Sequence, residues 1–274
     1  SDDDLGYDDG IRDFPSFVQR AINSNQKLDR SNFKTYELAN AGREFVNSEL
    51  WVIQEGDVPL DNSVNFTYGD ELDIGIEDIL DDESATIGVL LTAGVKSSWE
   101  TQEGIRQTGD IQGQGDGTSI VIRGNDKTFK STSNNVTTYL MAVAGIETDT
   151  AELKYTGMYI HKGTKEARTL QGYDTSDSGN VREDFTEFFE IELTNHQLNY
   201  NYIFQNDMEL DLRLASGDAS RYAPYERVVF YEDTDDRGYW QYDVNTGRNQ
   251  TQFSYVDDTN ENFGMDLTFF FLSF

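Results

Sequence analysis

The 274-residue chain contains no cysteine and only three prolines. The absence of cysteine excludes a disulfide scaffold, a thiolate metal site and a cysteine nucleophile. Basic residues are also scarce, because 21 Lys and Arg stand against 51 Asp and Glu and give a formal net charge of -30. Phosphate backbones repel a chain of this charge, so we exclude nucleic acid as a partner.

Long apolar runs are absent as well, and none approaches the ~18 residues that a membrane-spanning helix needs. A membrane is not thereby excluded, since a transmembrane strand needs only about ten alternating residues, half of which are polar. What the chain does contain is 13% aromatic residues. That content is too high for a solvated, disordered tail and favours strands.

Alternation of apolar and polar residues with a period of two dominates the sequence and predicts β-strands. In 87–99 the odd positions are mostly apolar and end in Trp99, whereas the even positions are small or polar. The same alternation occurs in 151–159, 198–204, 208–214 and 265–271. We therefore predict an all-β fold of antiparallel strands.

Two kinds of connection separate these strands. Short polar segments at 146–151, 194–197 and 205–207 are predicted hairpin turns, and long acidic segments at 108–118, 171–184 and 231–247 are predicted loops. Short turns at one end and long loops at the other are typical of outer-membrane β-barrels. Aromatic residues near the strand ends would then form girdles at the membrane surfaces. These residues are Trp99, Tyr139, Tyr155, Tyr159, Tyr200 and Tyr202.

A soluble β-sandwich with one buried face produces the same alternation. The strands on either side of 205–207 favour the barrel, because they exceed the ~5–6 residues of typical soluble strands. We predict an antiparallel transmembrane β-barrel with short periplasmic turns and long extracellular loops. Residues 1–60 form a loop-rich acidic segment with a brief helical pattern at 14–23. Residues 61–274 hold the barrel strands and extracellular loops.

Five stretches of the chain, taken in this order, carry a resemblance to a known family. They are 41–47 (AGREFVN), 59–73 (PLDNSVNFTYGDELD), 134–139 (NNVTTY), 152–168 (ELKYTGMYIHKGTKEAR) and 206–227 (NDMELDLRLASGDASRYAPYER). Together they resemble TonB-dependent outer-membrane receptors of Gram-negative bacteria. The resemblance implies energy-coupled uptake of a scarce nutrient across the bacterial cell outer membrane, such as a siderophore, cobalamin, a saccharide or a peptide.

The same resemblance implies three kinds of partner besides the nutrient: the lipid bilayer, a plug domain and a TonB-type energy-coupling protein. A complete receptor of this family also has a barrel of roughly 22 strands, which needs more than 274 residues at about ten residues per strand. No plug-like segment or TonB box is identifiable in this sequence. We therefore expect the chain to be a segment of a larger barrel.

Nothing in the sequence indicates catalysis, and we expect no enzyme. The two histidines, His161 and His196, lack a serine or carboxylate pattern around them, and neither GxSxG nor HExxH occurs. Calcium is the cofactor that the acidic loops would suit, because clustered carboxylates supply hard oxygen ligands. The alternative is that these loops are merely solvated. The candidate ligands are Asp2, Asp3, Asp4, Asp8, Asp9, Asp233, Asp235 and Asp236.

A group of aromatic residues in 222–242 provides the candidate ligand-binding residues: Tyr222, Tyr225, Tyr239 and Trp240. Exposed aromatic side chains in loops bind sugars or peptides, although the same residues could pack a small core of their own. A second function therefore stays open beside transport. It is that of a secreted or surface-attached acidic β-sandwich that binds carbohydrate or Ca2+.

Overall fold

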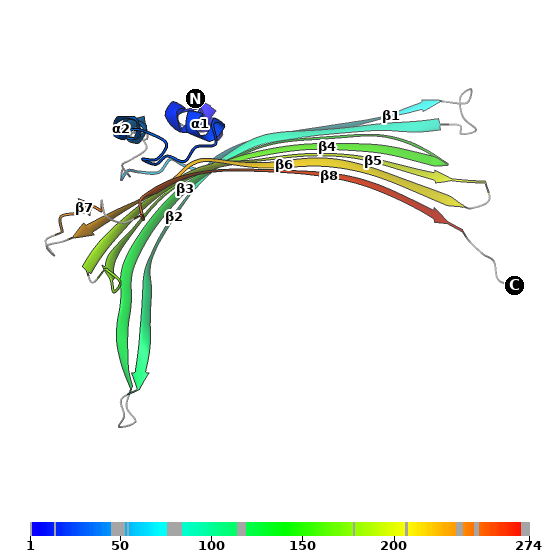
Figure 1. Ribbon diagram of the computed structural model, residues 1–274. Coiled ribbons are helices and arrows are strands. Elements are labelled where there is room, and N and C mark those ends of the chain that lie inside the picture. Colours follow the sequence, from blue (N-terminus) through cyan, green and yellow to red (C-terminus); the bar gives the residue numbers. More distant parts are fainter. Residues whose placement is uncertain are drawn as a thin grey trace.

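One long, bent antiparallel sheet dominates the computed structural model (Figure 1). The structure describes residues 2–13, 15–44, 53, 55–75, 84–113, 119–177, 179–205, 208–233, 238–243 and 247–269. Three short helical elements come first: η1 (Asp2–Leu5), α1 (Ser16–Asn23) and α2 (Thr35–Glu44). The strands follow: β1 (Asn62–Gly75), β2 (Ser84–Gly113), β3 (Ser119–Thr148), β4 (Ala151–Asp174), β5 (Gly179–Ile203), β6 (Glu209–Asp233), β7 (Gln241–Tyr242) and β8 (Gln250–Thr268).

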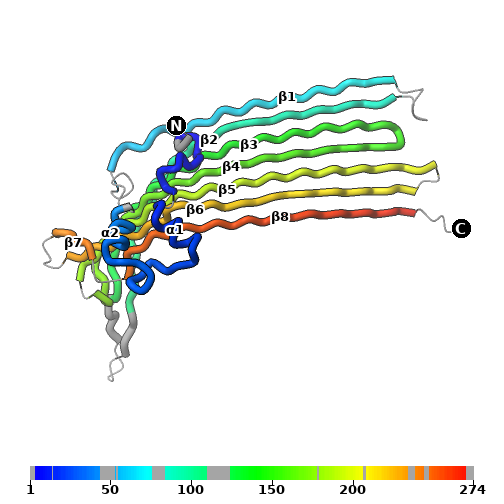
Figure 2. The backbone as a smooth tube through the Cα atoms, turned by 45° about the horizontal axis from the view of Figure 1, so that its top comes forward, coloured from blue at the N-terminus to red at the C-terminus, as the bar shows by residue number. Residues whose placement is uncertain are grey.

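Neighbours in the sheet are mostly neighbours in sequence. The strands β1 to β6 pair in chain order, β8 pairs with β6 along most of its length, and β7 pairs with β6 at Tyr231 and Glu232. Figure 2 shows the long strands β1 to β6 and β8 side by side. The prediction of an antiparallel all-β fold is confirmed. Within the described residues the sheet is open, with β1 and β8 at its two long edges.

The strands are much longer than those of ordinary soluble sheets. Strands β2 and β3 contain 30 residues each, which corresponds to about 100 Å at ~3.3 Å per residue. A bulge interrupts β6, where the register shifts between Ala223 and Glu226 and Tyr225 adopts a φ of 66°. Such a bulge adds one residue to the strand and bends it.

The predicted turn at 146–151 is confirmed as the β3–β4 connection, which is formed by residues 149–150. The predicted turn at 205–207 falls between β5 and β6, and residues 206 and 207 lie outside the described residues. The predicted turn at 194–197 is wrong, because these residues lie within β5 and pair with both β4 and β6. Their polar side chains are accommodated on the faces of the sheet while both neighbouring strands satisfy their backbone. The predicted loops at 108–118 and 171–184 are also shorter than expected, since β2, β4 and β5 extend into them.

The N-terminal helices pack on one face of the sheet, and the strands bend away from them (Figure 1). The helical pattern expected at 14–23 is confirmed by α1, which buries Phe17, Val18 and Ala21 and follows Pro15, a residue suited to the start of a helix. Phe17 packs against Phe33 with 5.2 Å between ring centroids. None of the described helices is long and apolar enough to cross a membrane.

Candidate functional site

The strand registers sort the side chains into two faces, because successive residues of a strand point to opposite sides. One row across the sheet takes a residue from each of seven strands. Its members are Leu72, Ile87, Ile146, Leu153, Tyr200, Leu212 and Met265. We call the face that carries this row the apolar face and the opposite side the polar face.

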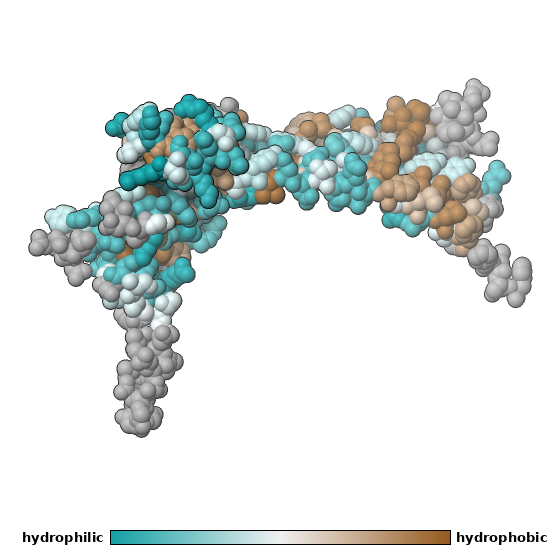
Figure 3. Space-filling view, in the orientation of Figure 1, coloured by the Kyte–Doolittle hydropathy of each residue, from teal (hydrophilic) through white to brown (hydrophobic). Residues whose placement is uncertain are grey.

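Large apolar side chains on the apolar face are exposed. Leu72 is 63% exposed, Met265 61%, and Phe263 in the next row 70%. The space-filling view shows apolar residues gathered at the end of the sheet that carries the short turns (Figure 3). Asp70 on β1 interrupts this surface, and its carboxylate accepts the Tyr68 hydroxyl at 2.9 Å. An apolar surface seven strands wide is typical of contact with a membrane or with another protein.

The apolar surface runs diagonally across the strands. On β1 it reaches Val64 and on β2 Val95, far from the short turns, whereas on β6 and β8 it stops at Leu214 and Phe263. A band that is level with a membrane crosses tilted strands in this way.

Four of the predicted girdle residues lie on the apolar face within the apolar surface or at its limits. Tyr200 and Tyr202 stack with 6.3 Å between centroids close to the β5–β6 turn. Tyr159 lies toward the other limit of the band, where its hydroxyl donates to Glu192 at 3.2 Å. Between these levels, the hydroxyl of Tyr155 is 2.7 Å from Nδ1 of His196. The aromatic residues therefore mark both limits of the apolar surface.

The remaining two predicted girdle residues are placed differently. Trp99 shares the apolar face but lies far beyond Tyr159, level with Lys165, and its backbone N–H donates to Asp61 at 2.7 Å. Tyr139 lies on the polar face, because it pairs with Gly94 and Ile160, whose side of the sheet is opposite to that of Ile87 and Leu153. Its side chain cannot share a girdle with Tyr155.

Beyond the apolar surface, the same face holds the N-terminal segment, residues 2–13. Gly6, with a φ of 83°, lies against Val136 and Gly163. A Cβ atom added to Gly163 would be 1.9 Å from the carbonyl oxygen of Gly6, so the contact requires glycine. The guanidinium of Arg12 covers the buried ring of Phe188 on β5. Its Cζ lies 4.3 Å from the ring centroid.

A buried histidine lies beneath this segment. His161 is 1% exposed, its Nε2 is 3.2 Å from Glu190, and its Nδ1 has no hydrogen-bond partner among the described residues. The other oxygen of Glu190 accepts the backbone N–H of Asp8. Burial raises the pKa of the Asp8 carboxyl; Arg12 opposes this shift, and Asp13 and Glu190 add to it. The contact thus combines close packing with clustered carboxylates.

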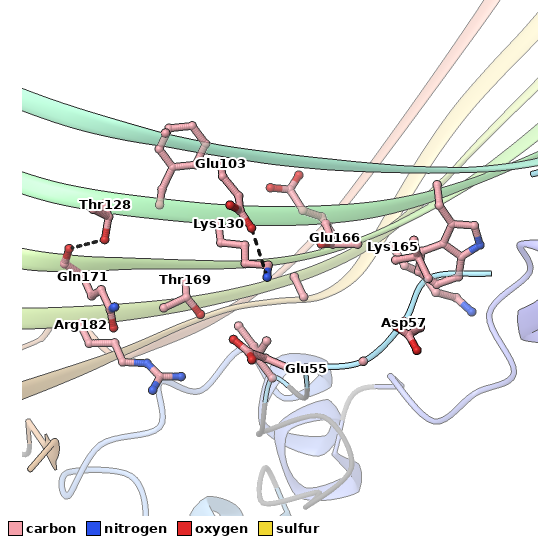
Figure 4. A pocket seen from close by; sticks show the side chains of 18 of the residues that line it. Glu55, Asp57, Glu103, Thr128, Lys130, Lys165, Glu166, Thr169, Gln171 and Arg182 are labelled. Atoms are coloured by element: carbon pink, nitrogen blue, oxygen red, sulfur yellow. Dashed lines mark hydrogen bonds and ion pairs between the residues drawn. The ribbon is translucent and has the colours of Figure 1, made fainter. Parts of the chain in front are cut away.

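A groove of about 1220 Å³ lies between residues 55–58 and the far part of the sheet (Figure 4). Charges of both signs line it. Lys130 pairs with Glu103 at 3.2 Å, and Arg182 donates two hydrogen bonds to Asp184 at 2.8 and 2.9 Å. Figure 4 shows Glu55 pointing across the groove toward Lys130. The groove is a polar cleft, and two of its strand cations, Lys130 and Arg182, have carboxylate partners.

The structure does not bring the four predicted ligand-binding aromatic residues together. Tyr222 and Tyr225 lie in β6 rather than in a loop, and Tyr225 is buried with its hydroxyl 2.6 Å from Arg227. Tyr239 is 72% exposed and, with Trp240, precedes β7, which pairs with Tyr231 rather than with the Tyr222 region. The long extension of β6 separates the two pairs.

The predicted calcium ligands are only partly described. Asp2, Asp3 and Asp4 lie in η1, and the side chains of Asp2 and Asp3 are outside the described residues, as are Asp235 and Asp236. Asp233 is buried, and its carboxylate accepts the backbone N–H of Gly238 at 2.8 Å. In the described part of the chain, no three histidine or carboxylate groups converge as metal ligands. Calcium binding stays a prediction.

Carboxylates form a row on the polar face near the short turns. The row contains Asp73, Glu147, Glu152, Asp211 and Asp266, with Thr86 and Asn201 between them. Three contacts reduce the repulsion between these carboxylates: Thr86 donates to Asp73 at 2.7 Å, Asn201 donates to Asp211 at 3.1 Å, and Arg213 pairs with Asp266. Glu147 and Glu152 still face each other directly, an arrangement that needs water or counter-ions.

Sequence analysis missed the docking of residues 2–13 on β4, although Gly6 and Gly163 were visible as glycines. No signal in the sequence connects positions so far apart. Comparison with protein-family models gives no match, and no curated protein matches the chain.

Proposed function

We propose that this chain forms part of the wall of an antiparallel β-barrel in the bacterial outer membrane. The barrel would serve TonB-dependent uptake of a scarce nutrient, as the sequence resemblance implies. The observation that carries the membrane part of the proposal is the apolar row across seven strands, of which Leu72, Ile87, Leu153 and Met265 are exposed, with a row of carboxylates on the opposite side. An apolar outside and a wet inside are what a spanning sheet needs.

The dimensions of the apolar surface support this assignment. On β4 it extends over Ala151–Tyr159, which is about 30 Å along the strand and about 23 Å in thickness at a tilt of ~40°. Outer-membrane barrels present an apolar band of ~25 Å. The rest of β4, Ile160–Asp174, would extend about 50 Å further on the extracellular side.

The open edges of the sheet fit a section of wall. Backbone groups of a strand edge in lipid must be paired, so β1 and β8 would each join a further strand. The plug domain, the TonB-type partner and the nutrient would act on the polar face, and the groove beside residues 55–58 would lie on the extracellular side. These roles follow from the resemblance and not from a bound ligand.

Spin labels on β4 test the orientation of the sheet. The chain has no cysteine, so single cysteines can replace Leu153 and Tyr155 on one face and Lys154 and Thr156 on the other. In reconstituted vesicles we expect the first pair to be accessible to oxygen in the lipid and the second to a water-soluble nickel chelate. Equal accessibility on both faces contradicts the proposal. So does a monodisperse monomer without detergent, which would favour the acidic β-sandwich.

A further inference from the structure

Two lysines that flank one threonine on the polar face form neither an ion pair nor a hydrogen bond within the described residues. They are Lys96 on β2 and Lys162 on β4, and both pair with Thr137 of the intervening strand β3. Several other cations of the sheet have carboxylate partners: Lys127, Lys130, Arg213 and Arg221. Lys154 and Arg106 share the polar face and also form no ion pair among the described residues, but they lie in other rows. Lys96 and Lys162 differ from these two cations in lying in one row, on either side of Thr137.

Most of the described side chains around these lysines are uncharged; the charged ones are Asp61, which lies beside Ser98 and accepts the backbone N–H of Trp99 at 2.7 Å, and Arg221, two strands from Lys162 in the same row. Ser63 and Thr137 share their row, and the next row holds Ser98, Asn135 and Thr164. The carboxylates closest along β2 and β4 on this face are Glu100 and Glu166, four residues further, about 13 Å away. That distance exceeds the ~8–10 Å screening length at physiological salt, so Glu100 and Glu166 reduce the positive potential of the lysines little, and Asp61 is the nearer acid on the β1 side of Lys96.

An aromatic side chain forms a flat floor beside Lys96. A Cβ atom on Gly94 would be 2.6 Å from Cζ of Tyr139, which shows that the Tyr139 ring lies across Gly94. The Tyr139 hydroxyl donates to Asn65 on β1 at 2.5 Å and so fixes the ring in this position. Hydroxyl groups, two ammonium groups and a fixed ring therefore lie together on one surface.

We propose that Lys96 and Lys162 bind a ligand with two or more carboxylate or phosphate groups. Their Cα atoms are two strand spacings apart, about 10 Å, so both flexible side chains can contact one multivalent anion. A lysine ammonium is a compact charge suited to carboxylate and phosphate oxygens, and Thr137 between them adds a hydroxyl donor. Anion binding requires only this surface. The further step, that the bound anion is the transported nutrient, rests on the proposed function.

Calorimetric titration of the detergent-solubilised chain tests the site, with citrate and pyrophosphate as probes and acetate at matched ionic strength as the monovalent reference. We expect both probes to bind more tightly than acetate, and Lys96→Gln and Lys162→Gln each to weaken binding at least tenfold. Lys154→Gln, on the same face of β4 but closer to the short turns, is the matched control and should bind as the unaltered chain does. Preference for one probe over the other distinguishes carboxylate from phosphate ligands.

Three results overturn the inference: no binding by the unaltered chain, no preference over acetate, or unchanged affinity in both lysine variants. The spin-label pattern of β4 is measured in parallel. If that pattern shows insertion but citrate and pyrophosphate fail to bind, only the anion site is wrong. If the anions bind but β4 shows no lipid-facing side, the site stands and the proposed function fails.

Discussion

The phenol ring of Tyr7 lies parallel to the imidazole ring of His161, with 3.7 Å between centroids and 9° between planes. The contact joins the start of the chain to the middle of β4 and covers a histidine that is fully buried. The Tyr7 hydroxyl is also 3.4 Å from that of Tyr159. Residues 2–13 thus end where the apolar surface begins.

Docking of this segment depends on Gly163. We expect Gly163→Val to displace residues 2–13, because the added Cβ would overlap the carbonyl of Gly6; overpacking of this kind costs about 1–3 kcal/mol. The measurement is hydrogen exchange of residues 2–13 together with chemical modification of His161, both of which should rise. Gly88→Ala is the control, since a Cβ there meets no atom within 4 Å. Unchanged protection in Gly163→Val would show that the contact does not hold the segment.

The docking should also depend on pH through Asp8. Its pKa is raised in the folded chain by burial, with Arg12 opposing and Asp13 and Glu190 contributing. A raised pKa means that the protonated form is favoured on folding, so this stabilisation is complete below the ordinary aspartate pKa and is lost as pH rises through the raised value. We expect protection of residues 2–13 to be greater near pH 4 than at pH 7.

The variant Asp8→Asn separates this effect from other titrations. It should keep residues 2–13 protected at pH 7 and reduce the difference between the two pH values, as measured by hydrogen exchange corrected for intrinsic rates. A pH dependence equal to that of the unaltered chain would assign the effect to another group.

The sequence predicted the strands well because period-two alternation survives wherever one face is apolar. The segment 151–159 is an example, and its odd residues all lie on the apolar face. Strand ends were predicted poorly. Polar residues such as Asn195 and His196 look like a turn, but β4 and β6 on either side satisfy their backbone. Pairing with distant strands is not visible in local composition.

The candidate sites were harder to predict than the fold. Tyr222 and Tyr225 were expected in a loop with Tyr239, but β6 continues through them, and its bulge at Tyr225 has no clear local signature. The unpaired state of Lys96 and Lys162 depends on the register of three strands. A sequence shows which residues alternate, but it does not show which ones become neighbours.

Salt should stabilise the sheet through the row of carboxylates near the short turns. Glu147 faces Glu152 across β3 and β4, and Asp211 faces Asp266 across β6 and β8. Screening weakens such repulsion, with a Debye length of about 10 Å at 0.1 M salt and about 3 Å at 1 M. We expect the thermal unfolding midpoint to rise with NaCl, and Glu147→Gln to reduce that rise. A rise with CaCl2 but not with NaCl at equal ionic strength would instead support specific calcium binding.

Leu198 and Asn199 provide the sharpest test of which face contacts lipid. They are adjacent in β5 but lie on opposite faces, Leu198 level with Leu214 and Asn199 level with Arg213. A lysine on the lipid side of a barrel costs about 2–4 kcal/mol near the bilayer midplane, whereas the wet side tolerates it. We therefore expect Leu198→Lys to lower the stability of the vesicle-inserted chain by about this amount, measured by denaturant titration, and Asn199→Lys to change it by less than about 1 kcal/mol. Equal effects of the two substitutions would mean that neither face contacts lipid, and a larger effect at Asn199 would reverse the orientation of the sheet.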